Sequence, residues 1–173
     1  MKKILTLFAV IGLVAFSSCE GPEGPQGPQG PEGPVAEVFE ISNVNFTAAN
    51  NYTISQKLNP VIFDSDVVLI YRLSGTINPT TPIWQQIPRT IYNARGELDY
   101  DFDFSREDFS IYADANYDIA LTPEFLNGQT FRIVIVPGSF STTGKSASKP
   151  DYSDYNEVIK KYNIDDSNVK KLN

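Results

Sequence analysis

Two short stretches decide the fold class: residues 67–73 (VVLIYRL) and residues 131–136 (FRIVIV). Both are rich in β-branched residues, and apolar side chains fall on both faces of each stretch rather than at a helical period. Such runs are typical of central strands that are buried on both sides. They predict a β-sheet protein with these two strands near its centre.

Residues 98–104 (LDYDFDF) add a second kind of strand, because they alternate strictly between apolar and acidic side chains. Alternation with a period of two places the apolar side chains on one face and the Asp side chains on the other. This pattern predicts a half-buried antiparallel strand with a solvated outer face. Residues 83–92 precede it across the turn sequence of residues 93–96 (NARG), and the two stretches together predict a hairpin.

Further strands are expected at residues 38–46, 52–58 and 109–113. The apolar face of the first switches from Phe39 and Ile41 to Val44 and Phe46, which predicts a bulge near residues 42–43. Turn sequences recur between the strands, and no helices alternate with them. We therefore expect an all-β fold, an antiparallel β-sandwich of about seven strands over residues 36–140, with immunoglobulin-like or transthyretin-like topology. Residues 122–124 (TPE) predict one helical turn that ends by Gly128.

The last part of the chain, residues 141–173, is expected to hold a linker, a short helix and a tail. Residues 139–150 are rich in Ser, Thr and Lys and predict the linker. A helix is expected from a cap at Asp151 or Ser153 to about Tyr162. Its apolar stripe would either pack on the sandwich or form a docking face for a partner; the stripe consists of Tyr152, Tyr155, Val158, Ile159 and Tyr162.

The N-terminus has the three parts of a secretory signal. Lys2 and Lys3 precede an apolar run at residues 4–16, and small residues follow. The run is shorter than the ~20 residues that a spanning helix needs, although an uncleaved anchor or a buried first helix remains the alternative. Cys19, the one cysteine of the chain, stands where the signal peptide (residues 1–18) would end.

Residues 16–19 (FSSC) resemble the lipobox of bacterial lipoproteins, in which a signal peptidase cuts just before a diacylated cysteine. The resemblance implies lipidation at Cys19 and anchoring in a membrane, because two or more acyl chains hold a protein stably. Glu20 and Glu23 resemble the acidic export signals of Gram-negative lineages. They favour an outer-membrane lipoprotein exposed on the cell surface over a periplasmic one.

A repeat follows the cysteine directly. Residues 21–35 (GPEGPQGPQGPEGPV) are five Gly-X-Y triplets with Pro at every X position. Glycine at every third residue lets three chains meet at a crowded axis. Residues 1–35 thus resemble bacterial collagen-like lipoproteins. Cys19 and the repeat together make up a stalk, residues 19–35. The repeat forms either a trimeric triple helix or a single-chain polyproline-II spacer of about 45 Å. Because five triplets are few, we prefer the spacer and a monomer.

Charge and composition exclude several function classes. The chain has 14 Lys and Arg against 21 Asp and Glu, and loss of residues 1–18 removes two lysines, which leaves 12 − 21 = −9. Such a surface repels polyanions, so no nucleic-acid partner is expected. The chain has no histidine, which removes Ser–His–Asp catalysis and imidazole metal sites. No G-x-G-x-x-G or P-loop sequence is present, and we expect no enzyme activity and no organic cofactor.

Residues 97–118 concentrate eight acids against one Arg. We prefer to interpret them as a solvated sheet face that discourages edge pairing. A calcium site is the alternative, because Asp114, Asn116 and Asp118 have the D-x-N-x-D spacing of calcium loops, although Ile119 replaces the turn glycine and the closing Glu is missing. A pair of glycosidase carboxylates is the remaining interpretation, and a small sandwich rarely builds the cleft that it needs.

Trp84 is the remaining candidate for ligand binding. In residues 83–87 (IWQQI) it faces away from the two Ile, together with Gln86. It is therefore either a sugar-stacking platform or a side chain covered by a loop or the second sheet. Two hypotheses follow: a non-catalytic cell-envelope lipoprotein whose β domain has an interaction or structural role, or a carbohydrate-binding module, with calcium assisting. The membrane and a protein or glycan ligand are the expected partners.

Overall fold

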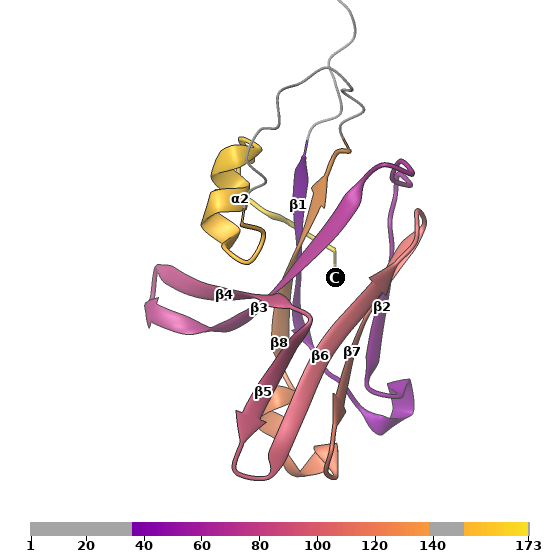
Figure 1. Cartoon of the computed structure of the whole chain (residues 1–173), viewed down its shortest axis with the longest axis vertical. Coiled ribbons are helices and arrows are strands. Elements are labelled where there is room, and N and C mark those ends of the chain that lie inside the picture. The colour runs from indigo at the N-terminus through magenta and orange to yellow at the C-terminus, as the bar shows by residue number, and fades with distance from the viewer. Residues whose placement is uncertain (1–35, 139–150, 173) are drawn as a thin grey trace, which may run out of the picture. The chain divides into compact units, whose positions relative to one another are not determined.

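The computed structural model describes residues 36–138 and 151–172. The signal peptide, Cys19, the Gly-X-Y repeat and the linker at residues 139–150 lie outside these described residues. The described part holds nine strands, three 3₁₀ turns and one α-helix (Figure 1). In chain order they are β1 Glu37–Val44, η1 Ala48–Asn50, β2 Thr53–Lys57, β3 Val67–Asn78, β4 Thr81–Ile87, β5 Arg89–Asn93, β6 Gly96–Phe104, β7 Asp108–Ala115, η2 Ile119–Leu121, η3 Pro123–Phe125, β8 Gln129–Val136, α2 Tyr155–Lys161 and β9 Lys170–Lys171.

The strands form two sheets. The first sheet has the order β4-β3-β8-β1-β9 and the second has the order β2-β7-β6-β5. All strand pairs are antiparallel except β1 with β9, which is parallel. The prediction of an all-β fold with antiparallel sheets and one short helix is confirmed. The strand order differs from that of a constant-type immunoglobulin domain, in which the first two strands share a sheet, because β1 and β2 lie in different sheets here.

The predicted strand at residues 83–92 is wrong in one respect: it is two strands, divided at Pro88. β4 ends at Ile87 and pairs with β3, whereas β5 begins at Arg89 and pairs with β6 in the other sheet. Proline has no N–H to donate to a ladder, so the first sheet ends there and the chain crosses to the second. The hairpin between β5 and β6 is confirmed, with Asn93 opposite Gly96.

Two other local predictions are confirmed. The register of β1 against β8 shifts between Ile41 and Val44, which is the expected bulge, and Asn43 within it has φ 56. Asn tolerates this left-handed conformation better than most residues. A short 3₁₀ turn at Pro123–Phe125 begins at the predicted proline and ends before Gly128.

The main core fills the space between the two sheets, so the fold is a β-sandwich. Phe131 of the first sheet and Tyr100 of the second lie with ring centroids 5.9 Å apart, and Phe46 contacts both rings. Burial of Tyr100 raises its pKa to about 12, although the guanidinium of Arg72 opposes the shift. Arg72 is itself buried, donates from Nε to Gln129 Oε1 at 2.8 Å and lies 4.8 Å from the centre of the Tyr100 ring.

A second core covers the outer face of the first sheet. Val158 of α2 is fully buried there, and the rings of Tyr71 and Tyr155 lie 5.2 Å apart. The other buried members of this cluster are Ala36, Val38, Leu69, Val134, Val136 and Ile164. The apolar stripe of the helix therefore packs on the sandwich. This layer also explains why β3 and β8 are apolar on both faces, since the second sheet covers one face and α2 covers the other.

The helix begins one residue later than a cap at Ser153 predicts and three residues later than a cap at Asp151 predicts. Asp154 caps it, because its Oδ1 accepts hydrogen bonds from the backbone N–H of Asn156 at 2.9 Å and of Glu157 at 3.2 Å. Neither Asp151 nor Ser153 caps the helix, and these two residues bond to each other instead. After the helix the chain returns to the first sheet, where β9 pairs with β1 and Leu172 N donates to Glu40 O at 3.0 Å. This strand was not predicted, because two lysines carry no strand pattern.

Candidate binding surfaces

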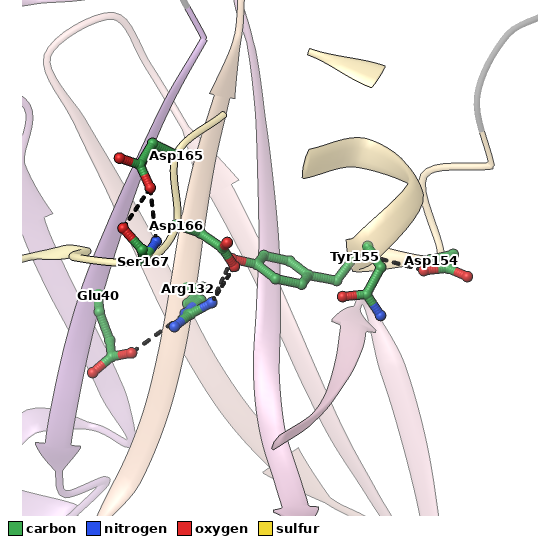
Figure 2. A network of polar contacts seen from close by, with 8 residues as sticks. Glu40, Arg132, Asp154, Tyr155, Asp165, Asp166 and Ser167 are labelled. Atoms are coloured by element: carbon green, nitrogen blue, oxygen red, sulfur yellow. Dashed lines mark hydrogen bonds and ion pairs between the residues drawn. The ribbon is translucent and has the colours of Figure 1, made fainter. Parts of the chain in front are cut away.

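Arg132 of β8 contacts β1, α2 and the C-terminal tail on the outer face of the first sheet (Figure 2). Its Nε lies 3.4 Å from Glu40 Oε2 on β1, and its Nη1 lies 2.9 Å from Asp166 Oδ2 in the tail. Nη1 also donates to the Tyr155 hydroxyl of α2 at 2.5 Å, and that hydroxyl donates to Asp166 Oδ2 at 2.9 Å. Burial raises the pKa of Tyr155, so the hydroxyl remains protonated and able to donate. This network attaches the helix and the tail to β8 and β1.

Trp84 lies beside this network. It faces away from the core residue Ile87, as the alternation predicts, but α2 covers it. The guanidinium carbon of Arg132 lies 4.6 Å from the Trp84 ring centre, and the Tyr155 ring lies 5.7 Å from it. The indole N–H is buried and has no hydrogen-bond partner within the described part of the chain. A buried donor without an acceptor costs about 1–3 kcal/mol.

An open groove of about 500 Å³ runs along the edge of Trp84. One wall is the β3–β4 hairpin, which projects to one side of the domain in Figure 1, and the other is the start of α2. Ile77 and Ile83 line it from the hairpin. The polar side comes from the helix start, through Asp151, Ser153, Asp154 and Asn156. Aromatic and carboxylate side chains together suit a ligand with both C–H faces and hydroxyl groups.

The Asp-rich segment forms part of the outer face of the second sheet. Leu98 and Tyr100 are fully buried whereas Asp99 and Asp103 are exposed, which confirms the half-buried strand in its first part. At its end the alternation fails, because Phe104 is 42% exposed and Asp101 is half-buried. Asp99 lies directly opposite Asp114 of β7. Like charges in that position repel, and water and salt screen them at an exposed site.

The structure gives each of the three residues of the D-x-N-x-D sequence a backbone N–H partner. Asn116 Oδ1 accepts from Glu97 N at 3.0 Å, and Asp118 Oδ1 accepts from Ala120 N at 3.2 Å as the cap of η2. Asp114 Oδ1 accepts from Ala115 N at 2.8 Å. A Cβ at Gly96, where φ is +145, would lie 2.2 Å from Asn116 Oδ1, so glycine lets these two turns close on each other. Within residues 36–138 and 151–172 no three Asp, Glu, His or Cys side chains are grouped so that they could hold a metal ion.

A third surface was missed by the sequence analysis. An apolar cavity of about 190 Å³ opens where β1 begins and β8 ends, and the loop between β2 and β3 borders it. Phe39, Ile135 and Leu172 line it from the first sheet and the tail. Leu58, Pro60, Val61, Ile62 and Phe63 line it from the loop. The signal in the sequence was the apolar triplet at residues 61–63 (VIF) inside a loop, where a polar turn would be ordinary.

Comparison of the chain with protein-family models, with curated proteins and with solved structures found no match. The candidate surfaces are therefore judged on their own chemistry. In the described residues, no helix is both long enough and apolar enough to cross a membrane.

Replacing Arg132 with Leu should destabilise the domain by about 3 kcal/mol, because Glu40 and Asp166 would be left partly buried without their cation. Urea unfolding monitored by circular dichroism would measure the loss. Lys171→Leu is the matched control, since its ammonium lies 4.0 Å from Glu40 Oε1 with 65% of its side chain exposed, and it should cost less than about 1 kcal/mol. Equal losses in the two variants would contradict the anchoring role of Arg132.

Calcium should not raise the melting temperature of residues 20–173 more than magnesium or sodium does at equal ionic strength, because exposed carboxylates on a solvated sheet face are screened by water and salt alike. A bound ion would add about 2.7 kcal/mol at a hundredfold excess over Kd, a shift on the order of 10 °C. A calcium-specific shift of that size, lost in Asp114→Asn/Asp118→Asn, would establish the calcium site.

Proposed function

We propose that the chain is a non-catalytic, lipid-anchored protein of the bacterial cell envelope that displays its β-sandwich as an interaction or structural domain. The order of the segments carries the proposal. The expected secretory signal ends at Ser18, Cys19 and the Gly-X-Y repeat follow, and β1 begins at Glu37, two residues after the last triplet. Lipid on Cys19 would hold the chain in the outer membrane, with the domain on the cell surface.

The construction of the domain supports a display role. The tail returns to pair with β1, and the Arg132 network fixes α2, so the last residues of the chain stabilise the first strand. A sandwich closed in this way is suited to a tethered position. The two finer topologies expected, immunoglobulin-like and transthyretin-like, both remain proposals and rest only on the presence of two packed, mainly antiparallel sheets.

The groove beside Trp84 favours carbohydrate binding as the second candidate function. A sugar could place a C–H face against the aromatic rings and donate hydroxyl hydrogens to Asp151 and Asp154. Each of these carboxylates already accepts backbone hydrogen bonds through Oδ1, and a carboxylate has capacity for further ones. Calcium assistance is not needed for this mode of binding.

Replacing Cys19 with Ser should abolish incorporation of labelled palmitate in a bacterial host and leave the signal peptide uncleaved, because the thiol is the only acyl acceptor of its kind in the chain. Mass spectrometry of the N-terminus and autoradiography of the purified protein would measure both effects. Continued labelling of the variant would contradict the lipoprotein assignment. Ser18→Ala is the control, because a small residue before the cysteine should still be processed.

A glycan array probed with residues 20–173 should separate the two functions. If the groove binds sugars, a defined set of glycans should bind equally with calcium and with chelator. Asp151→Asn/Asp154→Asn should weaken that binding about tenfold or more, whereas Tyr92→Ser, a control at a side chain 77% exposed, should not. Absence of any glycan signal would leave the interaction or structural role as the function of the domain.

A further inference from the structure

We propose that the outer edge of β4 binds an extended peptide of another protein as an added strand, and that this peptide brings a Lys or Arg side chain to Asp151 and Asp154. The site is the groove beside Trp84, entered from the edge of the first sheet. The inference rests on the interaction role proposed above and names the chemistry of the partner. A peptide and a sugar would compete for this groove, and experiment can tell them apart.

The edge of the first sheet is open at β4. β4 is the last strand of that sheet, and in the described part of the chain it pairs only with β3. Ser74 Oγ of β3 donates to the carbonyl oxygen of Ile83 at 3.1 Å, so the backbone of Ile83 points toward β3. Backbone direction alternates along a strand, so Trp84 and Gln86 point their backbone N–H and C=O groups outward. Pro82 agrees with this direction, because a proline is tolerated in a paired strand where its missing N–H falls on the edge side.

β4 lacks the protection that the other edge strands carry. The other edges of the two sheets are β2, β5 and β9, and each contains a basic residue: Lys57 in β2, Arg89 in β5 and both lysines of β9. Charged side chains on an edge hinder pairing with another chain. Residues 73–88, which include all of β4, hold no charged side chain, although 20% of the whole chain is charged. An edge without this protection is suited to pairing with a partner strand.

Exposed apolar side chains border the same edge. Ile77 is 74% exposed and Ile83 is 38% exposed, and both line the groove together with Trp84. Neighbouring residues of a strand point to opposite faces, so a groove that reaches both Ile83 and Trp84 opens on the edge of β4 rather than on one face of the sheet. A peptide strand lying there would place alternate side chains on the Ile83 side and on the Trp84 side.

The charge of the groove selects the partner. Asp151 and Asp154 line it and are both exposed, and none of the described residues that line it is Lys or Arg. Hydrogen bonds from Ser153 lower the pKa of Asp151, which keeps this carboxyl ionised. Arg132 beside Trp84 does not neutralise the two carboxylates, since its guanidinium is already paired with two others. A cationic side chain is therefore favoured on the Trp84 side of an added strand, and an acidic one is repelled.

The two sides of the edge together define the sequence of the partner. A basic residue faces Asp151 and Asp154, and the apolar residues next to it in the peptide face Ile83, so basic and apolar positions alternate. Hydrogen bonds to the outward backbone groups of Trp84 and Gln86 supply affinity that does not depend on side chains. A sugar has no strand backbone to pair with these groups, and for this reason a peptide is the preferred occupant.

Fluorescence anisotropy of labelled peptides mixed with residues 20–173 tests the proposal. The probes are peptides of about eight residues, an ordinary strand length, that alternate Thr with Val and carry Lys, Gln or Glu at one central Thr position. The Lys peptide should bind saturably with Kd below about 1 mM, and about tenfold or more tightly than the Glu peptide, because the carboxylates attract one and repel the other. Methylation of every second backbone nitrogen should abolish binding in one register and preserve it in the other, since an added strand bonds along one edge only.

Substitutions in the protein locate the bound peptide. Ile83→Lys places a charge on the edge of β4 and should weaken binding of the Lys peptide about tenfold or more. Tyr92→Lys is the matched control, because it places the same charge on the edge strand β5, where the side chain is 77% exposed, and it should leave binding unchanged. Asp151→Asn/Asp154→Asn should reduce the difference between the Lys and Glu peptides to less than about threefold, while Asn still caps α2. Circular dichroism and thermal melting would show that each variant is folded.

Three results would overturn the proposal. The first is no binding of any probe peptide at about 1 mM. The second is peptide binding that a folded Ile83→Lys variant retains, or that both methylated registers retain, because either result excludes strand addition at β4. The third is a glycan that binds in the groove and that the Lys peptide does not displace. Lipidation is tested separately by Cys19→Ser, so failure of the strand site is distinguishable from failure of the cell-envelope proposal.

Discussion

The structure depends on one constraint: β3 and β8 are apolar on both faces, so the first sheet must be covered on both sides. The second sheet covers the inner face, where Ile70 and Ile133 are fully buried. The outer face needs a separate layer, because Tyr71 and Val134 point away from the sandwich core and are equally buried. Helix α2 and the tail supply that layer. Residues 151–172 are therefore part of the fold rather than an appendage to it.

Arg132 makes this outer layer specific. It is a cation on a mainly apolar sheet face, with 15% of its side chain exposed, and such a group needs compensating partners. Glu40 and Asp166 provide the charge, and Tyr155 and Trp84 provide the hydroxyl and the ring. Because these partners come from β1, the tail, α2 and β4, one side chain sets how the C-terminal segment docks. The same packing leaves the Trp84 N–H without an acceptor in the described part of the chain.

How well the sequence predicted each candidate site depends on how far apart in the chain the residues of that site lie. Strict alternation at residues 98–104 predicted the exposed Asp99 and Asp103 correctly, because side-chain direction in a strand depends only on neighbouring residues. It did not predict that Phe104 is exposed, because burial depends on what lies opposite. The D-x-N-x-D spacing did not reveal that Asn116 bonds to Glu97, because that contact joins two turns 19 residues apart. For Trp84, the alternation of side chains predicted the face of the strand on which the indole lies. Only the packing of α2 showed what covers the indole.

By itself the sequence determined the all-β class, the bulge in β1 and the amphipathic helix, since each of these follows from a short-range pattern of charge, size or polarity. The tertiary structure decided the division at Pro88 between two sheets, the strand order, the parallel pairing of Lys170–Lys171 with β1, and the apolar loop that faces outward at Phe63. These features depend on contacts between residues far apart in the chain. A local pattern cannot encode them, because the free energy of burying an apolar side chain depends on what lies opposite it.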